Sequence, residues 1–148
     1  MLTLVACTLA HLRAIQPEIP DVGLKLLGHY IRSGPALAAL LPDGRVFGAA
    51  GIAVQYPAVG DAWAAPSQLV REHPMLYART IRRILAKFAQ DLGLHRIQTV
   101  VDPRIPAYMR WIEWLGFECE TPKGMRRASF DGHDLMLYAK IMENGHGG

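Results

Sequence analysis

The sequence predicts an α+β domain built on a mixed, mostly antiparallel sheet of six or seven strands with flanking helices. Hairpin patterns lie toward both ends of the chain, and the order strand, helix, strand, helix fills residues 62–115. Two strands joined through a helix form a right-handed βαβ crossover, so these strands must be parallel neighbours. The length of 148 residues fits one domain with a single core. We expect residues 1–143 to form that domain and 144–148 to be a flexible, glycine-rich tail.

The first 33 residues predict one strand and two helices. Residues 2–7 form a short apolar run typical of a strand, and Thr8 is suited to cap a helix over 9–16, which Pro17 ends. A weaker apolar spacing indicates a second helix over 24–33.

Two apolar runs then flank a turn. Residues 36–41 and 45–54 surround Pro42-Asp43-Gly44, which is turn chemistry, so they predict a hairpin. A further extended stretch covers 62–70 and contains Pro66, which removes a donor from the strand ladder. This strand is therefore expected to lie at an edge, to carry a bulge, or to splay from its neighbour.

The strongest helix is predicted over 75–92. Its apolar residues recur at spacings of three and four, Pro74 suits its first turn, and Gly93 suits its C-terminal end. A strand over 94–101 follows, and a second helix begins at Pro106.

The last part of the chain predicts strands around a second turn. We expect strands over 117–120, 125–130 and 135–141, with Asp131-Gly132 as a hairpin turn.

Composition narrows the class of protein. Half of the residues are hydrophobic (51%) and a fifth are charged (20%), as in a globular domain, and no apolar run approaches the roughly 20 residues of a membrane-spanning helix. We expect a cytoplasmic protein without a membrane partner. Cys7 and Cys119 are expected to be buried thiols, and the six scattered histidines predict no metal site.

The basic residues are unevenly distributed. Residues 71–148 carry twelve of the sixteen, with the excess between Arg71 and Arg96. Such a region suits an anionic small molecule or nucleic acid, or is an ordinary solvated face. Because no aromatic residues interleave with Arg79, Arg83 and Lys87, we expect no specific nucleic-acid partner.

Two segments carry a resemblance to a known family. Residues 110–118 (RWIEWLGFE), which follow Gly93-Leu94-His95-Arg96-Ile97, resemble the E-K-L-G-F-E region of the GNAT (Gcn5-related) N-acyltransferase superfamily. Residues 131–138 (DGHDLMLY) are similar to the last hairpin of that family. The order of elements matches over nearly the whole chain, so the resemblance implies a GNAT-like fold.

The resemblance also implies a site for acetyl-CoA or another acyl-CoA. The site would lie between strands 62–70 and 94–101, with the cofactor's pantetheine arm paired to the backbone of Leu69, Val70 and Arg71. Its pyrophosphate would lie at the start of helix 75–92, where free N–H groups stabilise phosphate. The cofactor-binding residues there would be Leu76, Tyr77, Ala78 and Arg79, although Arg79 facing only solvent is an equal alternative.

Two positions depart from the family pattern. Leu76 stands where the phosphate loop has its central glycine, and Ile112 stands where many members carry a tyrosine that acts as general acid. Tyr108, one turn earlier, is the candidate acid, with a core aromatic as its alternative. The candidate bases are Glu72, which ranks first, and then His73 and Asp61.

The resemblance leaves two functional hypotheses. The first is an N-acyltransferase that transfers an acyl group from acyl-CoA to a small-molecule or protein amine. The second is a catalytically inactive GNAT-fold protein with an interaction role, similar to GNAT-like proteins of tailed phages and prophages. A homodimer or a phage-protein partner would be consistent with the resemblance.

Overall fold

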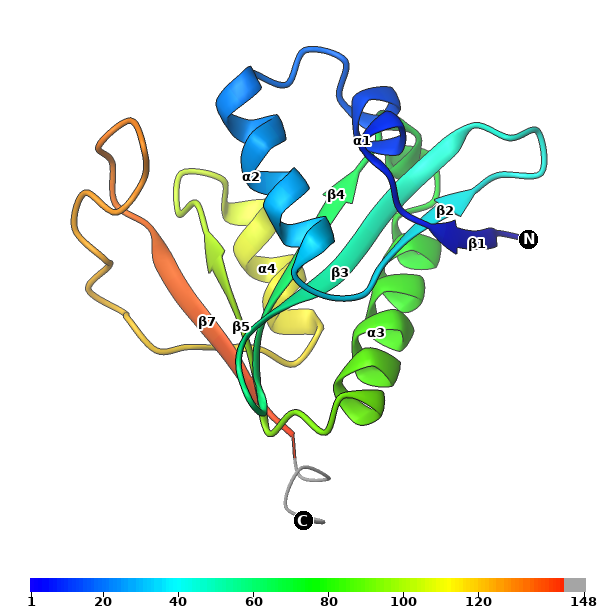
Figure 1. The fold of residues 1–148 in the computed structure, drawn as a ribbon. Coiled ribbons are helices and arrows are strands. Elements are labelled where there is room, and N and C mark those ends of the chain that lie inside the picture. The colour runs from blue at the N-terminus through cyan, green and yellow to red at the C-terminus, as the bar shows by residue number, and fades with distance from the viewer. Residues whose placement is uncertain (143–148) are drawn as a thin grey trace.

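The computed structural model describes residues 1–142 as one mixed sheet covered by helices on both faces (Figure 1). The expected tail over 144–148 lies outside the described residues. The elements in chain order are β1 (Thr3–Ala6), α1 (Leu9–Ile15), α2 (Asp21–Arg32), β2 (Ala36–Leu40), β3 (Val46–Tyr56), β4 (Val59–Pro66), the 3₁₀ helix η1 (Gln68–Glu72), α3 (Pro74–Asp91), β5 (Arg96–Val101), α4 (Pro106–Trp114), β6 (Glu118–Cys119) and β7 (Met136–Ile141).

The sheet has seven strands among the described residues, in the order β1-β2-β3-β4-β5-β7-β6. Only β4 and β5 are parallel, and every other neighbouring pair is antiparallel. The helix α3 connects β4 to β5, which confirms the predicted βαβ unit and the mostly antiparallel sheet.

Helices α1 and α2 cover one face of the sheet (Figure 1). The capping prediction for Thr8 is confirmed, because its side chain accepts a hydrogen bond from the backbone N–H of His11. Beneath these helices, Leu12 and Ile15 pack with Trp63 of β4 in a core that also holds the buried Cys7. Burial raises the pKa of the Cys7 thiol to about 11, so the group stays neutral.

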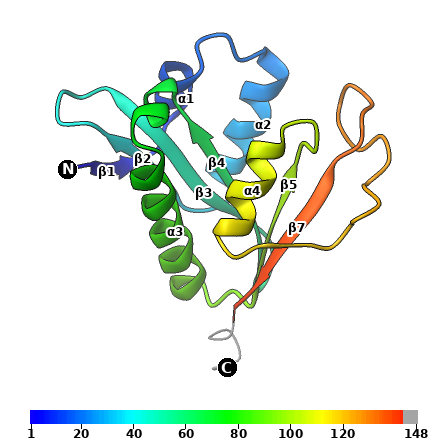
Figure 2. The ribbon, with the colours of Figure 1, turned by 180° about the vertical axis from the view of Figure 1, so that it is seen from behind.

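Helices α3 and α4 lie side by side on the opposite face (Figure 2). The apolar stripe of α3 is buried against β3, and this larger core includes Phe47, Ile81 and Leu85. Helix α3 begins at Pro74 and ends one residue before Leu92, within one residue of the predicted 75–92. The next residue, Gly93, has a φ of +64°, the left-handed conformation that a helix end favours for glycine.

Two predicted strands are wrong in extent. The stretch over 62–70 is extended only to Pro66, because the Ser67 side chain accepts a hydrogen bond from the N–H of Leu69 and starts η1. The second correction concerns 125–130, which is a loop with a single bridge between Met125 and Leu135.

Side-chain hydrogen bonds explain the second correction. Within that loop Ser129 and Asp131 both contact His133, and Asp102 of the β5–α4 turn lies 3.2 Å from its Nε2 atom. These local contacts replace the ladder of a hairpin.

Within residues 1–142, no helix is both long and apolar enough to cross a membrane.

Candidate functional site

The parallel strands β4 and β5 pair over three residues only and then separate. Their last partners are Asp61 and Gln98, although β4 continues to Pro66 and β5 to Val101. In Figures 1 and 2 the two strands meet near the C-terminal end of α3 and diverge toward its start. Within the described residues, no strand pairs with the edge of β4 that faces β5 beyond Asp61. We call this V-shaped separation of the two strands the opening; along it, the backbone groups on that edge of β4 have no strand partner.

A row of three aromatic rings crosses the α3/α4 face of this opening. The ring of Tyr77, in the first turns of α3, stacks on Trp111 of α4 with centroids 5.6 Å apart and planes 11° from parallel. Its other contact is edge-to-face with Phe47 of β3, at 5.8 Å. The stack links the two helices that border the opening.

Among residues 1–142, the hydroxyl of Tyr77 has no hydrogen-bond partner. The residue is 3% exposed and its Oη atom is buried. Burial raises the pKa of Tyr77 far above its ordinary value, and the nearby Tyr108 adds to the shift. The group is therefore protonated at physiological pH and can donate only to an acceptor that reaches it.

The opposite face of the opening carries a carboxylate. Asp61 lies at the last paired position of β4 and accepts a hydrogen bond from Nε2 of Gln55, at 2.6 Å. Tyr30 of α2 lies close by, and its pKa is raised by burial and also by the Asp61 charge. Trp63 packs in the core under α1 and α2, whereas Ala62 packs in the core on the other face. Because side chains alternate along a strand, Asp61 is on the same α1/α2 face as Trp63.

The start of α3 offers backbone donors toward the open end of the V. Pro74 occupies the first helical position, and His73 precedes it without a side-chain cap. The first turn of a helix leaves its N–H groups free, here those of Met75 and Leu76, and these attract anions. Both side chains are exposed, by 47% and 40% respectively.

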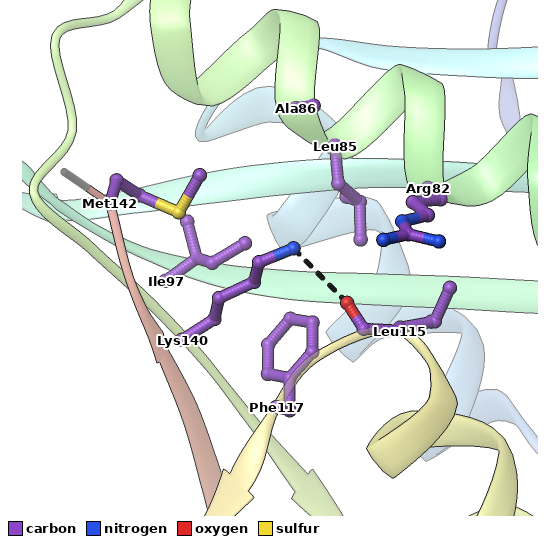
Figure 3. A pocket seen from close by; sticks show the side chains of 8 residues that line it. All are labelled: Arg82, Leu85, Ala86, Ile97, Leu115, Phe117, Lys140 and Met142. Carbon is purple, nitrogen blue, oxygen red and sulfur yellow. Dashed lines mark hydrogen bonds between the residues drawn. The ribbon is translucent and has the colours of Figure 1, made fainter. Parts of the chain in front are cut away.

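The described surface has two hollows, neither of which is lined by residues 62–66 of β4. The first, between α3, α4 and β7, holds about 10 Å³, which is room for one water at most (Figure 3). In it the Nζ atom of Lys140 donates to the carbonyl oxygen of Leu115, 3.1 Å away, at the end of α4. The second is a broad groove of about 510 Å³ between α1, the β2–β3 turn and the Ser67–Leu69 segment.

Comparison with known proteins bears on the fold. No family model and no curated protein matches the sequence. Among solved structures, a GNAT-family acetyltransferase from Streptococcus pneumoniae aligns with 96% of this chain and 99% of its own, at 16% identity and a TM-score of 0.69. This protein has the GNAT fold.

Two further structures share this fold. Mutant forms of the spermidine/spermine N-acetyltransferase from Vibrio cholerae align at 16% identity and a TM-score of 0.73, covering 99% of this chain and 98% of theirs. An IAA acetyltransferase from Bacillus cereus aligns at 11% identity and a TM-score of 0.75, covering 96% of this chain and all of its own. At such identities the shared property is the fold, which does not by itself specify an activity.

On the GNAT fold, the cofactor-binding residues predicted from sequence occupy two neighbouring segments. Leu69, Val70 and Arg71 lie in η1 instead of an extended strand, so the extended edge available for pairing is Ala62–Pro66. The other four residues lie in the first turns of α3. Of these, Tyr77 and Ala78 are buried, and Leu76 and Arg79 are exposed.

The predicted catalytic residues lie apart from each other. Glu72 ends η1 and is exposed, whereas Asp61 lies where β4 and β5 separate. Tyr108 is 49% exposed in the first turn of α4, so the alternative that it is a core aromatic is wrong. Ile112 is buried at 6% exposure and brings no hydroxyl to the opening.

The resemblance places Tyr77 among the cofactor-binding residues at the start of α3 but assigns no role to its hydroxyl. The spacing of Tyr77 also fits the apolar stripe of α3, which predicts a buried ring. A tyrosine at a core position does carry a signal, because its hydroxyl needs a partner that phenylalanine would not. The sequence does not show that this partner is missing.

Proposed function

We propose that the protein is an acyl-CoA-dependent N-acyltransferase. The observation that carries the proposal is the separation of β4 from β5 beyond Asp61 and Gln98, on a GNAT fold. An extended, amide-containing arm is the kind of ligand that pairs with an unpartnered strand edge. The structural neighbours named as acetyltransferases support the reaction class.

The residues around the opening fit such a cofactor. The free edge of β4 from Ala62 to Pro66 offers backbone donors and acceptors, and the buried hydroxyl of Tyr77 has no partner among the described residues. The start of α3 provides N–H groups for a pyrophosphate, with the exposed Arg79 one turn further on. Leu76 is compatible with this placement because its side chain is exposed and does not fill the opening.

When bound, the cofactor supplies an acyl group already activated as a thioester. The chain has three tasks: to hold the arm along β4, to orient an amine against the acyl carbon, and to take a proton from that amine. Asp61 is the carboxylate at the closed end of the opening, on the α1/α2 face. Its free acceptor capacity suits it to take the proton directly or through one water.

The acceptor is an amine, carried by a small molecule or a protein, that approaches from the α1/α2 face. One neighbour is named as an N-acetyltransferase of spermidine and spermine, and another as one of phosphinothricin. Asp61 would attract a cationic amine before it loses its proton. The cofactor side and the amine side are thus on opposite faces of the sheet, as direct transfer through the opening requires.

Acetyl-CoA binding tests this proposal. A ligand at 100 times its dissociation constant stabilises the folded state by about 2.7 kcal/mol, which raises the melting temperature of a domain of this size by roughly 5–10 °C. ATP, which carries phosphates but no pantetheine arm, is the matched control and should give a smaller shift. If millimolar acetyl-CoA neither moves the melting curve nor gives heat in calorimetry, the acyltransferase proposal is wrong.

The second candidate is a catalytically inactive GNAT-fold protein with an interaction role, of the kind found in phages and prophages. It is favoured by the aliphatic residues at two positions where the family carries functional ones, Leu76 and Ile112. This candidate predicts no acetyl-CoA binding, so the same titration separates the two.

A further inference from the structure

The Tyr77 hydroxyl is a buried donor without a hydrogen-bond partner in the part of the chain that the structure describes. The ring itself contacts Phe47 and Trp111. A buried polar group without a hydrogen bond reduces stability, and a phenylalanine would keep both ring contacts without that cost. The hydroxyl therefore points to a partner from outside the chain.

The ring's neighbours place it over the open end of the V. Gly48, against which the ring packs, pairs with Pro66 at the far end of β4. The stacked Trp111 belongs to α4, the helix that follows β5. The ring thus lies between β3 and α4, on the α3/α4 face of the sheet and at the end of β4 where the strands have separated.

The position along β4 indicates which part of a ligand meets the hydroxyl. Pro66 is five residues beyond Asp61, where pairing with β5 ends. At about 3.3 Å per residue, that separation is about 16 Å. An acyl group held beside Asp61 is therefore out of reach, and the arm that leads to it passes the ring.

Building on the proposed function, we propose that the Tyr77 hydroxyl donates a hydrogen bond to an amide carbonyl of the CoA arm in the opening. Tyr77 would then bind the cofactor through its hydroxyl. The arm is an extended chain with amide groups, and one of its carbonyl oxygens would accept this hydrogen bond near the open end. The Oη atom is covered in the structure, so the arm reaches it only when the side chains around it shift.

The protonation state of Tyr77 supports this role. Burial raises its pKa well above the ordinary value, and the Tyr108 hydroxyl raises it further. A neutral tyrosine is a donor, as an amide carbonyl requires.

Replacing Tyr77 by phenylalanine tests the proposal, because the substitution removes the hydroxyl and keeps the ring. We expect the Tyr77→Phe variant to bind CoA and acetyl-CoA with equal losses of affinity, roughly 5- to 20-fold, since both carry the arm. The melting temperature without ligand should be unchanged or higher, because an unsatisfied hydroxyl is lost. Tyr56→Phe, at the other end of β3 and 65% exposed, is the matched control and should bind like the wild type.

The outcomes distinguish this inference from the proposed function. If the wild type binds neither CoA nor acetyl-CoA, both proposals are overturned. If the wild type binds and Tyr77→Phe binds equally well, only the role of Tyr77 is overturned. A loss confined to acetyl-CoA would move the contact to the acyl end and overturn the assignment to the arm. A clearly lower melting temperature without ligand would show that the hydroxyl serves the fold, and would overturn the inference as well.

Discussion

A methyl group on Gly48 would lie 2.6 Å from Cε1 of Tyr77 and 3.2 Å from the carbonyl oxygen of Ala65. The glycine of β3 and the tyrosine of α3 therefore share one space, and the ring reaches the opening between β4 and β5 only because residue 48 has no side chain. The same small residue lets α3 lie close to the sheet. A local sequence pattern does not reveal this relationship, since Gly48 and Tyr77 are 29 positions apart in the chain.

Gly48→Ala should displace the Tyr77 ring. Its methyl group has backbone on one side and a buried ring on the other, so neither neighbour yields easily. Overpacking of this kind typically costs about 1–3 kcal/mol. We expect a lower melting temperature and a changed near-ultraviolet circular dichroism spectrum, because the stack of Tyr77 on Trp111 must shift.

Gly28→Ala is the matched control for that variant. Gly28 lies inside α2, and a methyl group there meets only the ends of two flexible side chains, Arg32 and Leu9, at 3.3–3.4 Å. Because alanine has a higher helix propensity than glycine, this substitution should stabilise the protein by up to about 1 kcal/mol. Equal effects of the two substitutions would show that Gly48 is not required for close packing.

Asp61 and Glu72 are alternative candidates for the general base of the proposed reaction, and their substitution separates them. Loss of a general base usually lowers the rate by about 10²- to 10⁴-fold. We expect that loss for Asp61→Asn, which keeps the shape of the side chain beside Gln55, and little change for the exposed Glu72→Gln. The measurement is thiol release from acetyl-CoA with an amine acceptor. A slow Glu72→Gln variant with a normal Asp61→Asn variant would restore Glu72 as the base.

Local sequence signals were sufficient for α3 and the βαβ unit. The apolar spacing between Pro74 and Gly93 predicts a helix that the structure matches within one residue at each end. The splay of β4 was one of three possibilities raised by Pro66. Its starting point at Asp61 depends on the register with β5, and register is set by tertiary packing. The sequence ranks Glu72 above Asp61 because Glu72 follows the end of the predicted strand over 62–70.

The loop over 125–130 shows a different limit. Its residues and the following Asp131-Gly132 have the pattern of a hairpin, and Gly132 does take a φ of +86°. The side chains of Ser129 and Asp131 instead bind His133, which lies within reach of Asp102 from the β5–α4 turn. A contact between segments about 30 residues apart cannot be read from a local pattern.

Asp102 should give the protein a measurable acid sensitivity. Hydrogen bonds from Arg104, and to a smaller degree the nearby His133, lower the pKa of Asp102 to about 2 from an ordinary 3.8. A lowered pKa in the folded state means that the ionised carboxylate stabilises folding. This contribution is complete above the unfolded pKa and is lost as the pH falls toward 2.

Asp102→Asn tests that contribution. Because the pair with Arg104 is largely at the surface, we expect the variant to lose less than about 1 kcal/mol of unfolding free energy at neutral pH. The difference from the wild type should shrink as the pH falls through the window between the two pKa values, as chemical denaturation at several pH values would show. Glu18→Gln, at an exposed position, is the control. A difference that stays constant with pH would mean that the charge of Asp102 contributes nothing.

Arg79 tests the anion site at the start of α3. It is the sixth residue of the helix, counted from Pro74, and is exposed. Side chains on a helix lean toward its N-terminus, so a guanidinium at this position is within one turn of the free N–H groups of Met75 and Leu76. If a pyrophosphate binds there, Arg79→Ala should weaken CoA binding by the roughly 1.5–3 kcal/mol of a charge-assisted hydrogen bond, or about 10- to 150-fold. The protein without ligand should keep its melting temperature, because the field of the helix end is weak beyond the first turn.

Arg83→Ala, one turn further along α3, removes the same charge from a more distant position and should cost less affinity. Calorimetric titration of CoA into both variants decides between the two roles, since equal affinities for the wild type and Arg79→Ala would leave Arg79 as a residue that only faces solvent.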